Sequence, residues 1–167
     1  MMTNDDQLLY FAFGSNLYLP RMQRRVPSAF PLTVAHLPGY RIDFHKVGDD
    51  GSTKCSITRD EDETVWGVVY RMLASERPLL DAAEGPGYEV IDIAVATPEE
   101  EWLHAFTYRA LPDRVGKGWP YTWYRDLVVQ GARHHALPAS YVARIADTTA
   151  VRDPDTRRER ANEPRHW

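Results

Sequence analysis

The stretch LLYFAFGSN, from Leu8 to Asn16, is the part of the sequence that says most about the fold. Its apolar and aromatic run up to Phe13 is short and continuous, as in a buried β-strand, and the Gly-Ser-Asn that follows is typical of a tight turn. Such a turn exposes successive backbone N–H groups, which can hold a carboxylate or a polarised carbonyl oxygen. The same residues also fit a plain turn into a helix, with Ser15 or Asn16 as its cap.

Further segments predict a sheet around this first strand. Tyr40, Ile42 and Phe44 alternate with polar residues, which is the period of a strand with one buried face. We expect two more strands at 54–58 and 65–70, joined by an acidic turn at 60–63. The last two strands are predicted at 90–95 and 102–108, with a turn between them.

Helical patterns separate and follow these strands. A helix is expected to begin with Ser75 as its cap and to end at Gly85 with positive φ. Its apolar face would consist of Leu79, Leu80 and Ala83. Apolar spacing predicts further helices around 124–131 and after Pro138, and a weaker pattern suggests a short one between 17 and 26. Many strands with few helices predict the α+β class with a small, barrel-like sheet.

Glu84 would lie in the last turn of the helix that ends at Gly85. A carboxylate at this position feels the negative end of the helix dipole, which raises its free energy as an anion and therefore its basicity. The alternative is an exposed glutamate with no chemical role, which is common at helix ends. The local sequence does not decide between the two.

Size, charge and cysteine content narrow the class of protein. A chain of 167 residues fits one domain, which we expect at 1–151, followed by a polar and flexible tail at 152–167. The net charge of −4 argues against nucleic acid as a partner. The only cysteine, Cys55, excludes an intrachain disulfide. With an acidic N-terminus and no apolar run of membrane-spanning length, we expect a cytoplasmic protein that does not bind a membrane.

The sequence contains no pattern typical of a metal site or of a serine hydrolase. His134 and His135 are adjacent, so on a helix they would point in different directions and could not converge on one ion. Ser15 does not stand in a nucleophile elbow, and the glycines follow neither the phosphate-loop nor the dinucleotide pattern. We expect no metal and no cofactor.

Five segments in order resemble the γ-glutamylcyclotransferase family. They are YFAFGSNL at Tyr10–Leu17, TVWGVVYRM at Thr64–Met72, LDAAEG at Leu80–Gly85, Tyr88, and YRDLVVQGA at Tyr124–Ala132. The resemblance implies a small mixed β-barrel with flanking helices and no cofactor. It implies that the enzyme cyclises γ-glutamyl amino acids to 5-oxoproline, in glutathione metabolism, with Glu84 as acid and base.

The resemblance also implies a substrate pocket. Its expected lining residues are Tyr10, Phe13, Gly14, Ser15, Asn16 and Tyr124. One of them departs from the family, whose loop usually has tyrosine at the position of Phe13, so a hydroxyl is missing there. The Asn16 that follows Ser15 favours γ-glutamyl amino acids over glutathione or γ-glutamylamines.

Two alternatives stay open at this point. A related enzyme could remove a γ-glutamyl group from another amine, such as a γ-glutamylamine or a biosynthetic intermediate. A protein of the same fold could also bind a ligand without turnover. The sequence does not decide the leaving group, the pathway or whether the chain forms a homodimer.

Overall fold

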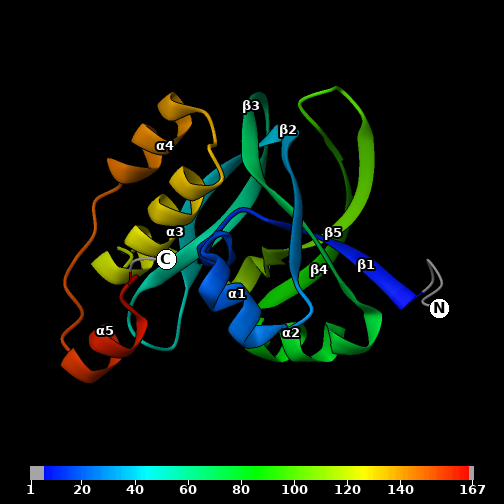
Figure 1. The fold of residues 1–167 in the computed structure, drawn as a ribbon. Helices are drawn as coiled ribbons and strands as arrows, with labels where there is room; N and C mark the ends of the chain where they lie inside the picture. Colours follow the sequence, from blue (N-terminus) through cyan, green and yellow to red (C-terminus); the bar gives the residue numbers. More distant parts are fainter. Residues whose placement is uncertain (1–5, 166–167) are drawn as a thin grey trace.

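Five strands form a closed barrel in the computed structural model, which describes residues 6–165 (Figure 1). The strands are β1 (Gln7–Ala12), β2 (Phe30–Val47), β3 (Thr53–Leu73), β4 (Tyr88–Ala96) and β5 (Trp102–Ala110). Their order around the barrel is β1-β3-β2-β4-β5. Because β1 runs antiparallel to β3 and parallel to β5, the barrel is mixed, and the predicted α+β class is confirmed.

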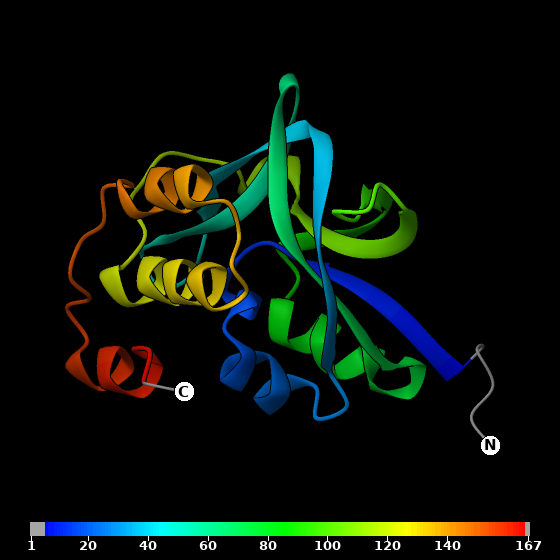
Figure 2. The ribbon, with the colours of Figure 1, turned by 45° about the horizontal axis from the view of Figure 1, so that its top comes forward.

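Short helices flank the barrel in the described part of the chain. They are α1 (Leu19–Arg25), α2 (Arg77–Glu84), α3 (Thr122–His134), α4 (Ala139–Ala146) and α5 (Thr156–Asn162), with the 3-10 turns η2 (Ser15–Leu17), η3 (Ala74–Glu76) and η4 (Pro112–Arg114). The helices α3, α4 and α5 gather on one side of the barrel, while α1 and α2 lie next to each other (Figure 2). None of these helices is long and apolar enough to cross a membrane.

β1 is the buried strand that the apolar run predicts, and it leads directly into η2. Phe11 and Ala12 are fully buried, and Tyr10 lies opposite Tyr70 on β3. Gly67 on β3 allows this close packing, since a Cβ there would lie 2.2 Å from the carbonyl oxygen of Ala12. The packing fixes the point at which the chain leaves the barrel and turns toward α1.

The η2 turn is also held from the side of α3. Gly131 on that helix approaches the turn so closely that a Cβ would lie 2.4 Å from the carbonyl carbon of Leu17. Leu17 itself is fully buried, and Leu127 on α3 is 1% exposed. The apolar spacing that predicts α3 thus places the Gly-Ser-Asn turn between the barrel and a helix.

β2 and β3 form one long antiparallel pair, which corrects the prediction for this region. We expected two strands joined by an acidic turn at 60–63, but both segments belong to β3 and pair with β2. The pairing shifts from Tyr40 opposite Arg59 to Pro38 opposite Thr64, so residues 60–63 bulge out of the ladder. Glu61 and Asp62 are exposed and the other two acids are half-buried. A run of acidic residues therefore fits a bulge as well as a turn, because both bring side chains into contact with water.

The helix that carries Glu84 begins later than predicted. Ser75 lies in η3 and Glu76 occupies the N-cap of α2 without a side-chain hydrogen bond, so the predicted Ser75 cap is wrong. Of the predicted apolar face only Leu80 is buried, whereas Leu79 is 51% exposed and position 83 is exposed. The end of the helix is as predicted, because Gly85 has a φ of 79° directly after Glu84.

The segment after Arg152 is folded, so the prediction of a flexible tail is wrong for the described residues up to 165. Asp153 is 1% exposed and accepts hydrogen bonds from Trp123 Nε1 at 2.9 Å and from Arg158 at 2.6 and 2.7 Å. Asp155 caps α5 by accepting from two backbone N–H groups at its start. This anchor is polar, and apolar periodicity therefore does not reveal it. His166 and Trp167 lie outside the described residues.

We predict that Asp153→Asn destabilises the fold. The carboxylate accepts from four donors, which belong to Trp123, to Arg158 and to the Asp155 backbone. An amide has only one acceptor oxygen, so some of these donors would lose their bonds. The melting temperature should fall by about 4 °C or more, measured by circular dichroism. The matched control is Asp92→Asn, at an exposed position on β4, which should melt as the wild type does. If both variants melted at the same temperature, the hydrogen bonds of Asp153 would not contribute to the stability of the fold.

Candidate active site

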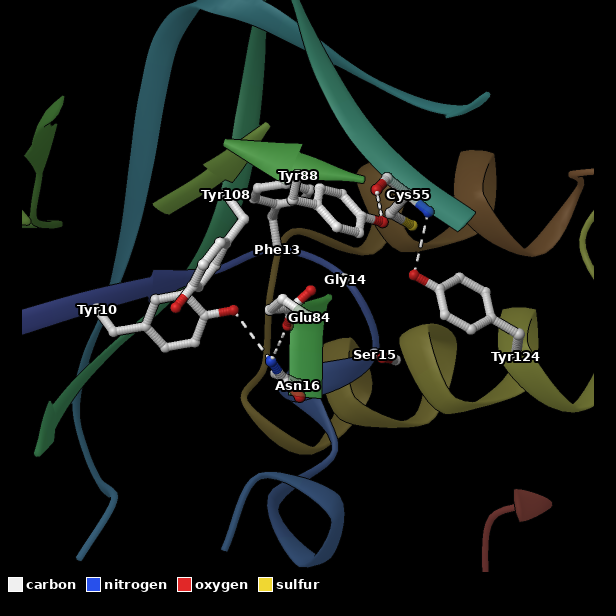
Figure 3. A pocket seen from close by; sticks show the side chains of 10 residues that line it. All are labelled: Tyr10, Phe13, Gly14, Ser15, Asn16, Cys55, Glu84, Tyr88, Tyr108 and Tyr124. Atoms are coloured by element: carbon white, nitrogen blue, oxygen red, sulfur yellow. Dashed lines mark hydrogen bonds between the residues drawn. The ribbon is translucent and has the colours of Figure 1, made fainter. Parts of the chain in front are cut away.

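A pocket lies where the η2 turn, the end of α2 and the barrel meet. Figure 3 shows its lining residues, which are Tyr10, Phe13, Gly14, Ser15, Asn16, Cys55, Glu84, Tyr88, Tyr108 and Tyr124. The structure therefore brings together all of the residues predicted for the site. Cys55, Tyr88 and Tyr108 were missed as lining residues. Tyr88 was noted only for its resemblance to the family, and nothing in the segments of Cys55 and Tyr108 distinguishes them from other residues of a strand.

Gly14 is needed at the entrance to the turn because of its neighbours. A Cβ there would lie 3.2 Å from Cys55 Cβ and 3.4 Å from the hydroxyl oxygen of Tyr124. Its neighbours leave little room for a side chain at this position, and this close approach explains the glycine. The backbone of the turn is thus pressed against β3 and α3, with Ser15 and Asn16 buried behind it.

Asn16 is the centre of the hydrogen bonds in the pocket. Its Nδ2 donates to Glu84 Oε1 at 2.8 Å and to the hydroxyl oxygen of Tyr10 at 3.1 Å. Its Oδ1 accepts from Arg25 on α1 at 3.0 Å, and its backbone carbonyl accepts from the Tyr70 hydroxyl at 2.8 Å. With these contacts the side chain has a single orientation, and it joins the turn, the barrel, α1 and α2 at one point.

The carboxylate of Glu84 is largely withdrawn from water. Its side chain is 14% exposed, which rules out the alternative of an exposed glutamate at a helix end. Asn16 and Arg25 both approach the same oxygen, Oε1, at 2.8 and 3.4 Å. The second oxygen, Oε2, is therefore the one available to a molecule in the pocket.

Burial raises the pKa of the Glu84 carboxyl, and the Arg25 cation and the Asn16 amide partly oppose this shift. The local sequence suggested a raised basicity from the helix end. Burial, which only the fold creates, is the cause seen in the structure. A carboxylate of this kind accepts a proton more readily than a solvated one.

Four phenols surround this carboxylate. Burial raises the pKa of Tyr10, Tyr88, Tyr108 and Tyr124, so these side chains remain neutral hydrogen-bond donors at neutral pH. The rings of Tyr10 and Tyr108 meet edge to face with centroids 5.8 Å apart. A pocket of this composition suits a small polar molecule with both charged and amide groups.

Two of these tyrosines hold the β3 backbone in place. The Tyr88 hydroxyl donates to the carbonyl oxygen of Cys55 at 2.9 Å, and the Cys55 backbone N–H donates to the Tyr124 hydroxyl at 3.0 Å. Burial also raises the pKa of the Cys55 thiol to about 12, so it stays protonated at neutral pH. The thiol therefore lines the pocket without the character of a nucleophile.

Comparison with known proteins agrees with this geometry. Residues 64–145 match the AIG2-like family, and the chain is 32% identical over 150 residues to the gamma-glutamylcyclotransferase of Homo sapiens. That match covers 85% of this chain and 79% of the human protein. The chain belongs to the gamma-glutamylcyclotransferase family. The Mus musculus member is likewise 32% identical, over 84% of this chain and 78% of its own length.

Solved structures of other proteins share the fold. A gamma-glutamyl cyclotransferase superposes with a TM-score of 0.82 at 27% identity, covering 93% of this chain and 99% of that one. A yeast gamma-glutamyl cyclotransferase specific to glutathione superposes with a TM-score of 0.64 at 13% identity, covering 84% and 94% of the two chains. At this identity the yeast protein shows a common fold alone.

Phe13, the departure from the family's usual loop, lies in the pocket wall. Its side chain is 6% exposed, and its ring centroid is 6.4 Å from that of Phe11. The ring therefore contributes apolar surface where a tyrosine would add a hydroxyl. The donors of the Asn16 and tyrosine side chains remain in place around it.

The histidines predicted not to bind a metal lie away from the pocket lining. His135 Nε2 is 3.0 Å from the carbonyl oxygen of Leu17, and the rings of His134 and His135 meet edge to face. Within residues 6–165 the His, Cys, Asp and Glu side chains form no group that could hold a metal ion. His135 is thus one more contact between α3 and the η2 turn.

We predict that Glu84→Gln makes the protein no less stable at pH 8. The raised pKa of Glu84 means that the folded chain binds more protons than the unfolded one between the two pKa values, so this carboxyl lowers stability as pH rises. Glutamine removes that effect. The melting temperature of the variant should equal or exceed that of wild type at pH 8, and its advantage should shrink toward pH 4.

The control for this comparison is Glu99→Gln, in the exposed turn between β4 and β5. Its difference from wild type should not change with pH in this way. If Glu84→Gln melted well below wild type at pH 8, the ion pair with Arg25 would outweigh burial of the carboxylate, and the direction of the pKa shift would be wrong.

Proposed function

We propose that this chain converts γ-glutamyl amino acids to 5-oxoproline and a free amino acid. The observation that carries the proposal is the buried Glu84 carboxylate, which offers Oε2 to the pocket beside the Gly14–Asn16 turn. The similar human and mouse proteins carry the name gamma-glutamylcyclotransferase, which supports the same reaction here.

The reaction begins with the α-amine of the γ-glutamyl group. At neutral pH this amine is an ammonium ion, and it cannot attack until it loses a proton. In the proposed mechanism Glu84 accepts that proton, and the amine nitrogen attacks the γ-carbonyl carbon to form a five-membered ring. Because the attack is intramolecular, the main task of the pocket is to hold the substrate in a folded conformation.

The second half of the reaction releases the amino acid. The bond between the γ-carbon and the leaving nitrogen breaks as Glu84 returns its proton to that nitrogen. The ring nitrogen then gives its remaining extra proton to the Glu84 carboxylate, and the released amine takes that proton up to become an ammonium ion. One carboxyl thus serves as base and then as acid, and no covalent bond to the protein forms. The raised pKa of Glu84 suits both steps, because it brings the protonated and ionised forms closer in free energy at neutral pH.

The negative charge on the γ-oxygen between these steps needs hydrogen-bond donors. The first N–H groups of a helical turn lack acceptors within the turn, and those at the start of η2 belong to Ser15 and Asn16. Neutral phenols such as Tyr10 and Tyr124, whose hydroxyl oxygens accept from Asn16 and from the Cys55 backbone, keep their own protons and can add donors where the backbone does not reach. We assign these groups to the oxyanion and to the substrate's α-carboxylate.

A substrate screen tests the proposal. We expect 5-oxoproline release from γ-glutamyl amino acids, with lower kcat/KM for glutathione and for γ-glutamylamines, measured by chromatography of the products. If the protein preferred a γ-glutamylamine, the leaving group would be an amine and not an amino acid, and the proposed substrate class would be wrong. Thermal stabilisation by these compounds without 5-oxoproline would make the chain a binding protein.

We further predict that Glu84→Gln loses turnover while it retains the fold. Glutamine keeps the size of the side chain and can bond with Asn16, but it cannot accept the ammonium proton. General acid and base groups typically contribute about 10²–10⁴-fold, and kcat should fall within that range. Glu99→Gln is again the control and should keep wild-type kinetics. Turnover of Glu84→Gln within a few fold of wild type would remove Glu84 from the mechanism.

A further inference from the structure

A lysine that forms no ion pair with any of the described residues lies beside the proposed active site. Lys46, near the end of β2, places its Nζ 4.9 Å from the ring centroid of Tyr88, which lines the pocket. Its side chain is half-buried. Within residues 6–165 no hydrogen bond or ion pair engages this ammonium, and the ring of Tyr88 is its one specific contact.

The next lysine along the chain, in contrast, has an ion-pair partner. Lys54, which pairs with Lys46 across the β2–β3 ladder, has its Nζ 2.8 Å from Asp50 Oδ2 and 3.0 Å from Ser52 Oγ. Its charge is neutralised by the protein itself, as is usual for a partly buried cation. Lys46 is also half-buried, but residues 6–165 supply no anion within ion-pair distance of it.

The chain directly after Glu84 is shaped around Lys46. Gly87, which lies between Glu84 and Tyr88, would carry a Cβ 2.7 Å from Lys46 Cε and 3.0 Å from Nζ. A side chain at position 87 would therefore displace the lysine from this position. The ammonium is also near enough to Glu84 to lower the pKa of that carboxyl, against the larger effect of burial.

The missing anion has a counterpart in the proposed substrate. A γ-glutamyl amino acid has two carboxylates, one on the γ-glutamyl group and one on the leaving amino acid, whereas a γ-glutamylamine lacks the second. With the γ-amide at Glu84, the second carboxylate lies a few bonds beyond the leaving nitrogen, on the side away from the ring that forms. An unpaired ammonium next to the pocket suits a group at that distance.

We propose that Lys46 binds the carboxylate of the leaving amino acid and so selects γ-glutamyl amino acids over γ-glutamylamines. This inference rests on the proposed function and names the substrate class within it. Lys46 acts on specificity, and Glu84 carries out proton transfer. The cation–π contact with Tyr88 holds the ammonium in position before substrate binds.

The test compares two substrates that differ only in the second carboxylate, γ-glutamylalanine and γ-glutamylalaninamide. Lys46→Met keeps an unbranched side chain of nearly the same length, which can still pack on Tyr88, but removes the charge. For γ-glutamylalanine we expect kcat/KM to fall about ten- to hundredfold, mainly through KM, because a hydrogen bond between charged groups is lost. For the amide the value should change less than about threefold. Lys46→Arg should retain most of the preference.

Lys117→Met, on the exposed connection between η4 and α3, makes the same change in net charge and should leave both substrates unaffected. An equal loss on both substrates in Lys46→Met would mean that the lysine merely supports Tyr88, and would overturn the inference while the proposed function stands. Unchanged kinetics on both would overturn it as well. If the wild type released 5-oxoproline from neither compound, the proposed function itself would fail, and the inference with it.

Discussion

The hydrogen bond from Asn16 to Glu84 is the interaction on which the site depends. It joins the turn after β1 to the end of α2, two segments that are far apart in the sequence, and it occupies one oxygen of the carboxylate. Arg25 reinforces both partners from α1. The other oxygen is thereby left facing the pocket, in a place that water barely reaches. A carboxylate buried with incomplete compensation is costly, and such a cost is usual where a protein needs a strong base.

The barrel serves this contact by fixing both of its ends. β1 is pressed against β3 where Gly67 permits close approach, and α3 is pressed against η2 where Gly131 does the same. The turn between them therefore has little freedom to move. At the other end, Gly85 terminates α2 immediately after Glu84, so the carboxylate projects from a rigid element. Both ends lie on well-packed structure, which is what a catalytic geometry requires.

Charge is distributed unevenly around the pocket. Arg25 and Lys54 each have a protein acceptor, and their charges stabilise the structure that surrounds the site. Lys46 has none within the described residues 6–165, although the chain from Glu84 to Tyr88 accommodates it through a glycine. A half-buried cation without an ion-pair partner does little to stabilise the fold, so a role in binding a ligand explains it better. We propose that the two groups have separate roles. The buried carboxylate of Glu84 transfers protons, and the unpaired ammonium of Lys46 binds the carboxylate of the leaving group.

The sequence by itself determined the elements that local patterns encode. The apolar run before Gly14, the glycine after Glu84 and the spacing in α3 predicted a strand, a helix end and a helix, because each depends on residues a few positions apart. The order of the short motifs then indicated the family and the members of the site. A pattern of charges alone was less reliable, as the acidic bulge at 60–63 and the folded segment after Arg152 show.

Only the tertiary structure decided the properties that arise between distant segments. The burial that raises the pKa of Glu84, the choice of Arg25 as its partner and the unpaired state of Lys46 all depend on how the strands close into a barrel. The same holds for Asp153, whose partner Trp123 stands on α3, 30 residues earlier in the chain. Local periodicity carries no record of such contacts, because hydrogen bonding and desolvation act through distances in space and not through separation along the chain.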